Sequence, residues 1–328
     1  MSADAERRSR LLALKLRALV RGHLGLDADP EGTPGTYGPG AVLITEDSVW
    51  VLVDGDPVRA LGGAVAWSLK HGKPLHLLVE SASGILVRRA SMLDLPIHVW
   101  HVDGTALLPA VAEPHLPVRE ASPAHLHFVD LIASAGADPV VEHGVVVGEV
   151  RGLEMCRVVD DADTGVARVE VGMGAHDREA FAMVHGDLPT EQALRQVIDA
   201  VLPHRSPGAD PHPLNSFGAE RLHRWRAIND PASFGFDSVV PADPSVVRTN
   251  LKDTVPCVAV GHSAGSRTLL AFVHGVDLDI VPFALDAADR HGASAVVLVS
   301  RDRDVVGPIR SMAAAARVPF SFRGIDPW

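Results

Sequence analysis

The feature that most constrains the fold is a similarity between two segments that lie 220 positions apart. Without a gap, residues 52–80 match residues 272–300 at seven positions: Val53/Val273, Gly55/Gly275, Ala64/Ala284, His71/His291, Gly72/Gly292, Leu78/Leu298 and Val79/Val299. Compositions of this kind give about two identities by chance. We therefore predict an internal duplication, in which two related arms cover apolar faces that neither arm buries alone.

Each arm has the pattern of an alternating α/β unit. In the first arm, two β-rich runs within residues 41–53, separated by Glu46-Asp47-Ser48, predict a hairpin. The segments that follow predict a helix from Pro57 to about Gly72, a strand over Leu75–Val79, a helix over Ile85–Leu93 and a strand over Ile97–Val102. The order of these elements is ββαβαβ, which is typical of an α/β fold.

The predicted fold class is therefore α/β, with two related ββαβαβ-type arms flanking a central β-hairpin and helix module of α+β type. We assign residues 1–119 to an N-terminal helix and the first arm, and residues 120–205 to the central module. Residues 206–328 comprise a basic helix, an irregular connection that leads to Pro256, and the second arm. Proline-rich stretches mark both boundaries.

Charge and composition favour some classes of protein over others. The formal net charge of −11 disfavours binding to extended nucleic acid, because the affinity of such proteins depends on neutralising phosphates. Only four residues are lysine, and Ala, Val, Gly and Pro are abundant, which predicts a bacterial protein from a GC-rich genome.

The sequence also predicts where the protein is found in the cell. No uninterrupted apolar run reaches the length of about 18 residues that a membrane-spanning helix needs. The N-terminal helix, residues 4–24, carries charges inside its Leu-rich part and predicts a docking helix instead of a targeting signal. Two cysteines, Cys156 and Cys257, do not make a disulfide framework. We expect a cytoplasmic protein without a membrane partner, and a homodimer is compatible with the available helices and edge strands.

Two glutamates of the central module form the first candidate site. Glu154 is expected on one strand and Glu170 on the next, with fifteen residues between them and a helix directly afterwards. Two carboxylates on adjacent strands can hold Mg²⁺ or Mn²⁺, which activates water against a phosphodiester. The order of helix (His125 to Ala135), strands and helix resembles the core of PD-(D/E)XK nucleases. The resemblance implies a metal-dependent nuclease or phosphodiesterase, with Glu154 and Glu170 as metal ligands.

The resemblance is incomplete at one position. The family's E-x-K motif corresponds here to Glu170-Val171-Gly172, which lacks the lysine. Arg178 or His176, at the start of the following helix, would have to replace it, and we take Arg178 as the group that stabilises charge. The alternative is structural, because Glu149, Arg151, Glu154 and Arg157 can form cross-strand ion pairs on a hairpin.

A second motif, Gly261-His262-Ser263-Ala264-Gly265, follows an apolar run. It resembles the nucleophile elbow of α/β-hydrolases, which implies a serine nucleophile at Ser263. In that family the histidine follows the acid along the chain, yet no histidine follows His291 here. The internal repeat also aligns this motif with the turn of the first hairpin. We therefore predict a hairpin connection at this motif.

A basic helix over Ser216–Ile228 carries Arg221, Arg224 and Arg226. Such a helix can contact phosphates, but it more often forms a solvated face paired with acidic neighbours. Every catalytic pattern in the chain lacks at least one group. The leading hypothesis is therefore a non-catalytic binding or scaffold protein that uses the groove between the arms and the central module. The alternatives are the metal-dependent nuclease and, third, the serine hydrolase.

Overall fold

The computed structural model describes residues 3–38, 40–185, 188–206, 208–210, 212–248 and 255–325. This part of the chain mixes helices with three sheets, which confirms the predicted α/β fold class. Contacts divide the chain into two units, each described by itself below. Unit 1 comprises Met1–His115, Asp277–Asp286 and Val305–Phe320, and unit 2 comprises Leu116–Val276, Ala287–Asp304 and Ser321–Trp328. Residues 249–254 of the predicted irregular connection lie outside the described residues.

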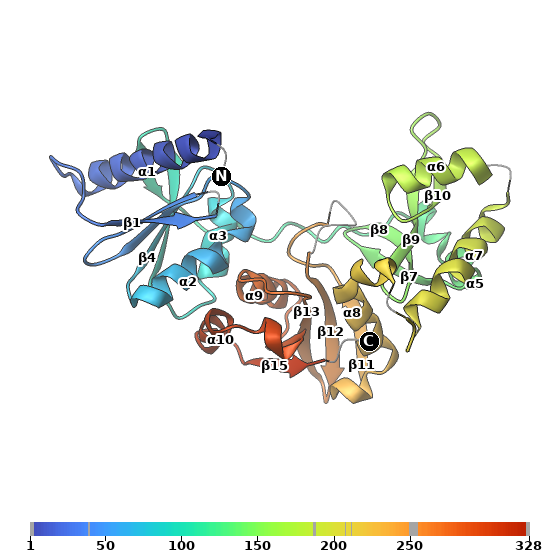
Figure 1. Ribbon diagram of the computed structural model, residues 1–328. Coiled ribbons are helices and arrows are strands. Elements are labelled where there is room, and N and C mark those ends of the chain that lie inside the picture. The colour runs from blue at the N-terminus through green and yellow to red at the C-terminus, as the bar shows by residue number, and fades with distance from the viewer. Residues whose placement is uncertain are drawn as a thin grey trace. The chain divides into compact units, whose positions relative to one another are not determined.

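Unit 1 is built on a six-stranded sheet with the order β1-β2-β3-β4-β5-β6 (Figure 1). Strands β3, β4 and β5 are parallel, because helices connect them, whereas the outer pairs are antiparallel. The helices and strands of the first arm are α1 (Ala3–Leu24), β1 (Thr33–Tyr37), β2 (Gly40–Ile44), β3 (Val49–Leu52), α2 (Leu61–His71), β4 (Leu75–Val79), α3 (Ser83–Ala90), β5 (Ile97–Asp103) and β6 (Ala106–Pro109). Helix α1 packs its apolar stripe on the sheet through Leu16, Leu19 and Val20. This packing confirms the predicted docking helix.

Unit 1 also contains Ile280–Asp286 from helix α9 (Ile280–Arg290) and all of helix α10 (Gly307–Ala314). A buried cluster of charges joins these segments to the first arm. The Arg89 side chain is 0% exposed, and its Nε donates to Asp286 Oδ2 at 3.0 Å. Asp279 lies 3.6 Å from Arg89 Nη1 and accepts a hydrogen bond from the backbone N–H of Gly62. Arg88 also donates to Asp286, at 2.8 Å, so both aspartates lie within ion-pair distance of arginines of the first arm.

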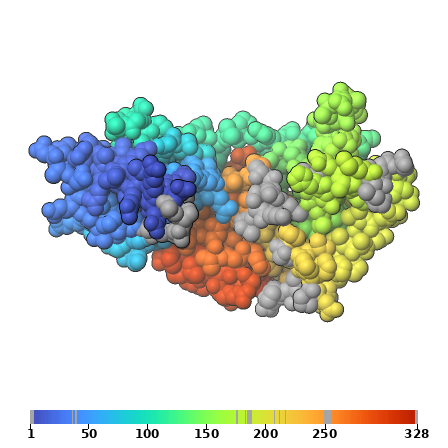
Figure 2. Space-filling model, turned by 45° about the horizontal axis from the view of Figure 1, so that its top comes forward, coloured from blue at the N-terminus to red at the C-terminus, as the bar shows by residue number. Residues whose placement is uncertain are grey.

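Unit 2 contains a four-stranded antiparallel sheet with the order β10-β9-β8-β7 and a five-stranded sheet with the order β11-β12-β13-β14-β15. The elements of the central module are α4 (Pro123–Leu126), α5 (Val129–Ser134), β7 (Asp138–Glu142), β8 (Val145–Val150), β9 (Leu153–Asp160), β10 (Ala167–Val171), α6 (Ala175–His185) and α7 (Thr190–Val201). Helix α8 (Ala219–Asn229) follows, and the strands of the second sheet are β11 (Ser238–Ala242), β12 (Cys257–Ser263), β13 (Ser266–Phe272), β14 (Ala295–Ser300) and β15 (Phe320–Gly324). Figure 2 shows helix α6, in yellow-green, at the surface of this unit.

The two arms have the same order of elements. An offset of 220 brings residues 61–71 of α2 to 281–291, against α9 at 280–290, and residues 75–79 of β4 to 295–299, against β14 at 295–300. In both arms a hairpin is followed by a helix and a parallel strand. The structure therefore contains the two predicted ββαβαβ arms. Descent of both arms from one duplicated segment stays a prediction.

The central module contains a tight turn at residues 151–152. Strand β8 ends at Val150 and β9 begins at Leu153. Arg151 and Gly152 between them have φ angles of +48° and +82°. Two successive residues of positive φ form the tight turn that suits the twist of a hairpin.

Four of the edge strands contain a proline. Strands β1 and β6 are the edges of the first sheet, β7 is an edge of the second, and β11 is an edge of the third. Each of these four strands contains a proline, in the sequences TPGTY, ALLP, DPVVE and SVVPA. Proline cannot donate to a strand ladder, so it is tolerated at the edges of sheets.

Among the described residues, no helix is both long and apolar enough to cross a membrane.

Candidate functional site

The two predicted glutamates share one face of the central sheet because of a β-bulge. Glu154 is paired with Glu149, whereas Cys156 is paired with Gly148, so Met155 is an extra residue in β9. Strict alternation would place residues 154 and 157 on opposite faces. The extra residue returns both to the same face, and Glu170 joins them because it is paired with Arg157. The predicted convergence of Glu154 and Glu170 therefore has a structural basis.

Arg178 joins the two glutamates. It lies in the first turns of α6, where its Nε donates to Glu170 Oε2 at 3.1 Å. Its Nη1 donates to Glu154 Oε1 at 3.4 Å. The structure thus brings together all three predicted residues, Glu154, Glu170 and Arg178.

Other arginines also bind these carboxylates. Arg157 donates to both oxygens of Glu154, at 2.9 and 3.0 Å, and Arg248 donates to Glu154 Oε2 at 3.4 Å. Arg168 donates to Glu170 Oε1 at 2.8 Å. Within the described part of the chain, no group of three His, Cys, Asp or Glu side chains is placed to hold a metal ion. This arrangement favours the structural alternative, ion pairing, over metal binding. Binding of Mg²⁺ or Mn²⁺ at these residues stays a prediction of the sequence.

A thermal melt separates these two interpretations. We expect that adding excess Mn²⁺ to chelator-treated protein leaves the melting temperature unchanged, because arginines already occupy the oxygens of Glu154 and Glu170. A ligand that binds only the folded state raises the melting temperature by mass action. A rise with Mn²⁺ in the wild type that disappears in Glu170→Ala would instead establish a metal site.

The ion pairs extend to residues that the sequence did not select as a site. Glu142 and Glu149 lie on the same sheet face, and helix α8 covers them with Arg221 and Arg224. Arg221 Nη1 lies 2.6 Å from Glu142 Oε2, and Arg224 Nη2 lies 3.0 Å from Glu149 Oε1. Burial alone would raise the pKa of Glu142, but the two arginines lower that pKa below its usual value. Glu149 is buried, Glu142 is largely buried, and arginines of helix α8 bind both carboxylates.

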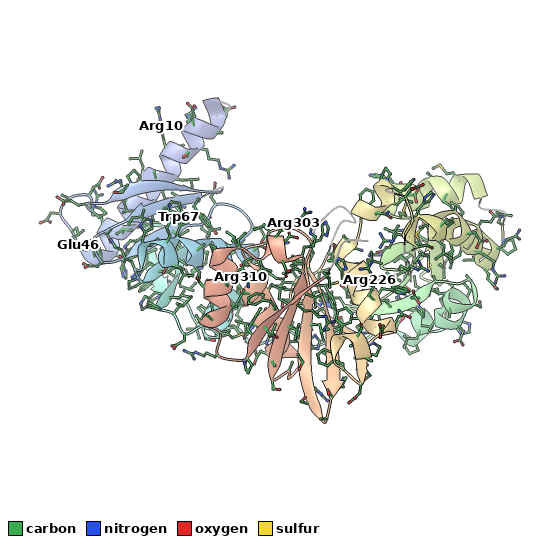
Figure 3. All side chains as sticks on the ribbon, turned by 60° about the horizontal axis from the view of Figure 1, so that its bottom comes forward. Arg10, Glu46, Trp67, Arg226, Arg303 and Arg310 are labelled. Carbon is green, nitrogen blue, oxygen red and sulfur yellow. The ribbon has the colours of Figure 1, made fainter. Side chains whose placement is uncertain are left out.

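The basic helix is therefore paired with acidic neighbours, as predicted, but it is not a solvated face. Residues Ala219 to Arg224 of this helix are all buried. In Figure 3 the label of Arg226 marks the position of helix α8. Two features of the sequence are compatible with this packing, although they do not predict it. Arg221 and Arg224 are three residues apart, so they share one face of a helix, and Glu142 and Glu149 flank a His-Gly turn between two strands.

The GHSAG motif forms a hairpin, which confirms the predicted connection. Ser263 at the end of β12 pairs with Ser266 at the start of β13, and the intervening Ala264 and Gly265 have φ angles of +47° and +78°. A nucleophile elbow requires a turn from a strand into a helix. This segment turns from a strand into a strand, so it does not present Ser263 as an elbow does.

A cavity of about 580 Å³ in unit 2 is a second candidate site. It is lined by the segment before α4, by the edge strands β7 and β11, and by β12 and β13. Four partly or largely exposed aliphatic side chains form its walls: Val118, Leu126, Val141 and Val240. Small-molecule sites typically have volumes of about 300–1,000 Å³ and mostly apolar walls.

Polar groups in the same cavity can orient a ligand. Asp243 is buried, and its Oδ1 accepts a hydrogen bond from the backbone N–H of His143 at 2.7 Å. Asp243 Oδ2 has no hydrogen-bond partner among the described residues. Arg119 and Arg267 add exposed positive charge, and His262, which belongs to the GHSAG motif, also lines the cavity. The sequence did not reveal this site, because its lining comes from segments spread over residues 118–291.

Comparison with known proteins gives no match to a family model, to a curated protein or to a solved structure. Function is therefore inferred from the geometry of the chain itself.

Proposed function

We propose that this chain is a binding protein without catalytic activity, and that its ligand occupies the cavity of about 580 Å³ in unit 2. The observation that carries this proposal is the combination of exposed aliphatic walls with Asp243 Oδ2, a buried atom that has no hydrogen-bond partner among the described residues. Two basic side chains lie near this atom without a hydrogen bond, His143 Nδ1 at 3.9 Å and Arg290 Nη2 at 4.0 Å. A buried polar atom without a partner is costly unless water or a ligand satisfies it. The cavity is lined by residues of the central module and of the second sheet, all within unit 2.

The chemistry of the lining indicates an amphipathic ligand. The aliphatic walls suit an apolar body, because burying apolar surface contributes about 25 cal/mol per Å². Arg119 and Arg267 suit an acidic group, and Asp243 Oδ2 suits a hydrogen-bond donor. A small organic acid with an apolar body and at least one donor meets all three requirements.

Binding of anilinonaphthalene sulfonate tests the proposal, because this dye combines an aromatic body, an acidic group and an N–H donor. We expect saturable fluorescence enhancement with the folded wild type. Val240→Asp should weaken the affinity by about tenfold, because it removes an apolar wall and adds a charge that repels the sulfonate. Val240 is 45% exposed, so its replacement should leave the fold intact.

A matched control is available in the same unit. Val166 is 64% exposed on the connection between β9 and β10, which projects from unit 2 in Figure 1. Val166→Asp should bind the dye as the wild type does. Equal affinity in Val240→Asp, Val166→Asp and wild type would refute the proposed cavity site and leave a scaffold role as the remaining form of the hypothesis.

The metal-dependent nuclease remains a second candidate for one reason, that Glu154 and Glu170 share a sheet face. The Mn²⁺ melt described above decides it. A cytoplasmic location is likewise a proposal, and it is supported by Cys156 and Cys257, which are both free and buried.

A further inference from the structure

A second, smaller cavity of about 60 Å³ adjoins the ion-pair face of the central sheet in unit 2. Three arginines and one histidine line it together with two glutamates: Arg157, Arg221, Arg248, His143, Glu142 and Glu154. A single water-sized position needs about 10–15 Å³. The cavity therefore offers about four to six such positions, which is enough room for a small tetrahedral oxyanion.

Three buried nitrogens at this cavity have no hydrogen-bond partner among the described residues. They are Arg221 Nε, Arg248 Nη1 and His143 Nε2. The side chains of Arg221 and Arg248 are 4% and 6% exposed, so bulk water does not satisfy these donors. Guanidinium groups carry only donors, so what they lack is an acceptor.

The oxygens of the two glutamates already have donors. Arg221 donates to both oxygens of Glu142, and Arg157 donates to both oxygens of Glu154. Arginines thus compensate the negative charge of both glutamates. The remaining unsatisfied groups at the cavity belong to the arginines and the histidine.

The described ion-pair network also has an excess of positive charge. Four glutamates, Glu142, Glu149, Glu154 and Glu170, are bound by five arginines: Arg157, Arg178, Arg221, Arg224 and Arg248. Arg168 adds a sixth, but it brings Asp161 as its own partner. Glu220 is also buried nearby, where burial raises its pKa, and it makes no ion pair within this described network. An excess buried cation is unfavourable unless an anion neutralises it.

We propose that this cavity binds one small tetrahedral oxyanion, of the phosphate or sulfate class, which accepts hydrogen bonds from Arg221 Nε and Arg248 Nη1. This site goes beyond the proposed function, since it uses a different cavity and a different ligand. The oxyanion completes the ion-pair face between the central sheet and helix α8. It acts as a structural ligand of unit 2.

The test measures melting temperature and phosphorus NMR line width with inorganic phosphate as the probe. Phosphate should raise the melting temperature of phosphate-free wild type saturably, by roughly 5 °C at a hundredfold excess over Kd. Arg248→Met should lose this rise and the broadening of the phosphate resonance. Without phosphate, this variant should melt no lower than the wild type, because it removes the excess charge while Glu154 keeps Arg157 and Arg178.

Arg195→Met is the matched control, because Arg195 is an exposed arginine of α7 paired with Glu191. It should keep the full response to phosphate. A non-saturable rise that potassium chloride reproduces at equal ionic strength would overturn the proposal, since it reports general screening. A full phosphate response in Arg248→Met would overturn the proposal as well. No response in the wild type would also overturn it and would mean that the cavity holds water instead of an anion.

Discussion

Replacing Arg89 by methionine is expected to lower the free energy of unfolding of unit 1 by about 3–5 kcal/mol. Removing one partner of a buried ion pair costs this much because the other charge is left without compensation. Arg89 is fully buried and neutralises Asp286, and it is the nearest cation to Asp279. Burial raises the pKa of Asp279 to about 7 even with Arg89 present, so the ionised form of this carboxyl is already disfavoured. The substitution leaves Asp279 without its arginine partner, whereas Asp286 keeps a single arginine, Arg88, at 2.8 Å.

Urea unfolding followed by tryptophan fluorescence measures this effect, since Trp50, Trp67 and Trp100 all belong to unit 1. The control is Arg21→Met, which removes an exposed pair with Asp29 in the same unit. Exposed pairs contribute about 0–1 kcal/mol, so the control should unfold nearly as the wild type does. Equal stability of the two variants would show that the buried cluster does not hold α9 to the first arm.

Replacing Glu149 by leucine should have a comparable effect on unit 2, with a loss of about 3–5 kcal/mol. Glu149 is buried between Arg221 and Arg224, at 3.2 and 3.0 Å, and Arg224 is itself 1% exposed. The substitution leaves Arg224 with Glu142 as its carboxylate partner, at 3.1 Å. The remaining buried positive charge is then the source of the instability.

A double-mutant cycle distinguishes this cause from lost packing. Adding Arg224→Leu to Glu149→Leu removes both charges and should restore much of the stability, because apolar replacements of a whole buried pair are often neutral. Calorimetry of the single and double variants measures the coupling. Glu191→Leu, at an exposed pair on α7, serves as the control. Additive losses in the double variant would mean that the pair contributes nothing beyond its packing.

The regular part of each arm was predictable because local signals agree there. The central parallel strands are short apolar runs, and Gly72, with a φ angle of +62°, ends α2 where the sequence predicts. The edge strands β1, β6, β7 and β11 were missed for a physical reason. Each contains proline, which in a sequence indicates a loop unless the neighbouring strand is known.

The candidate site was predictable only in part. The sequence predicts that Glu154 and Glu170 lie on neighbouring strands, and the pairing of β9 with β10 confirms this. Their shared sheet face depends on the β-bulge at Met155, which no pattern of residues in the sequence indicates. Arg248 and Arg221 come from segments far along the chain from the glutamates they bind. Such partners follow from tertiary packing, so sequence spacing alone does not reveal them. The cavity around Asp243 depends on packing in the same way.

The proline-containing edge strands also affect how copies of this protein meet each other. Four of the six edges of the described sheets lack one backbone donor at the proline, so a second chain cannot add a full strand there. Edge-to-edge growth of sheets is a common route to aggregation, and these edges oppose it. Strand addition between copies of this chain is therefore disfavoured at these four edges, and a homodimer that joined two sheets would use β10 or β15, whose sequences contain no proline.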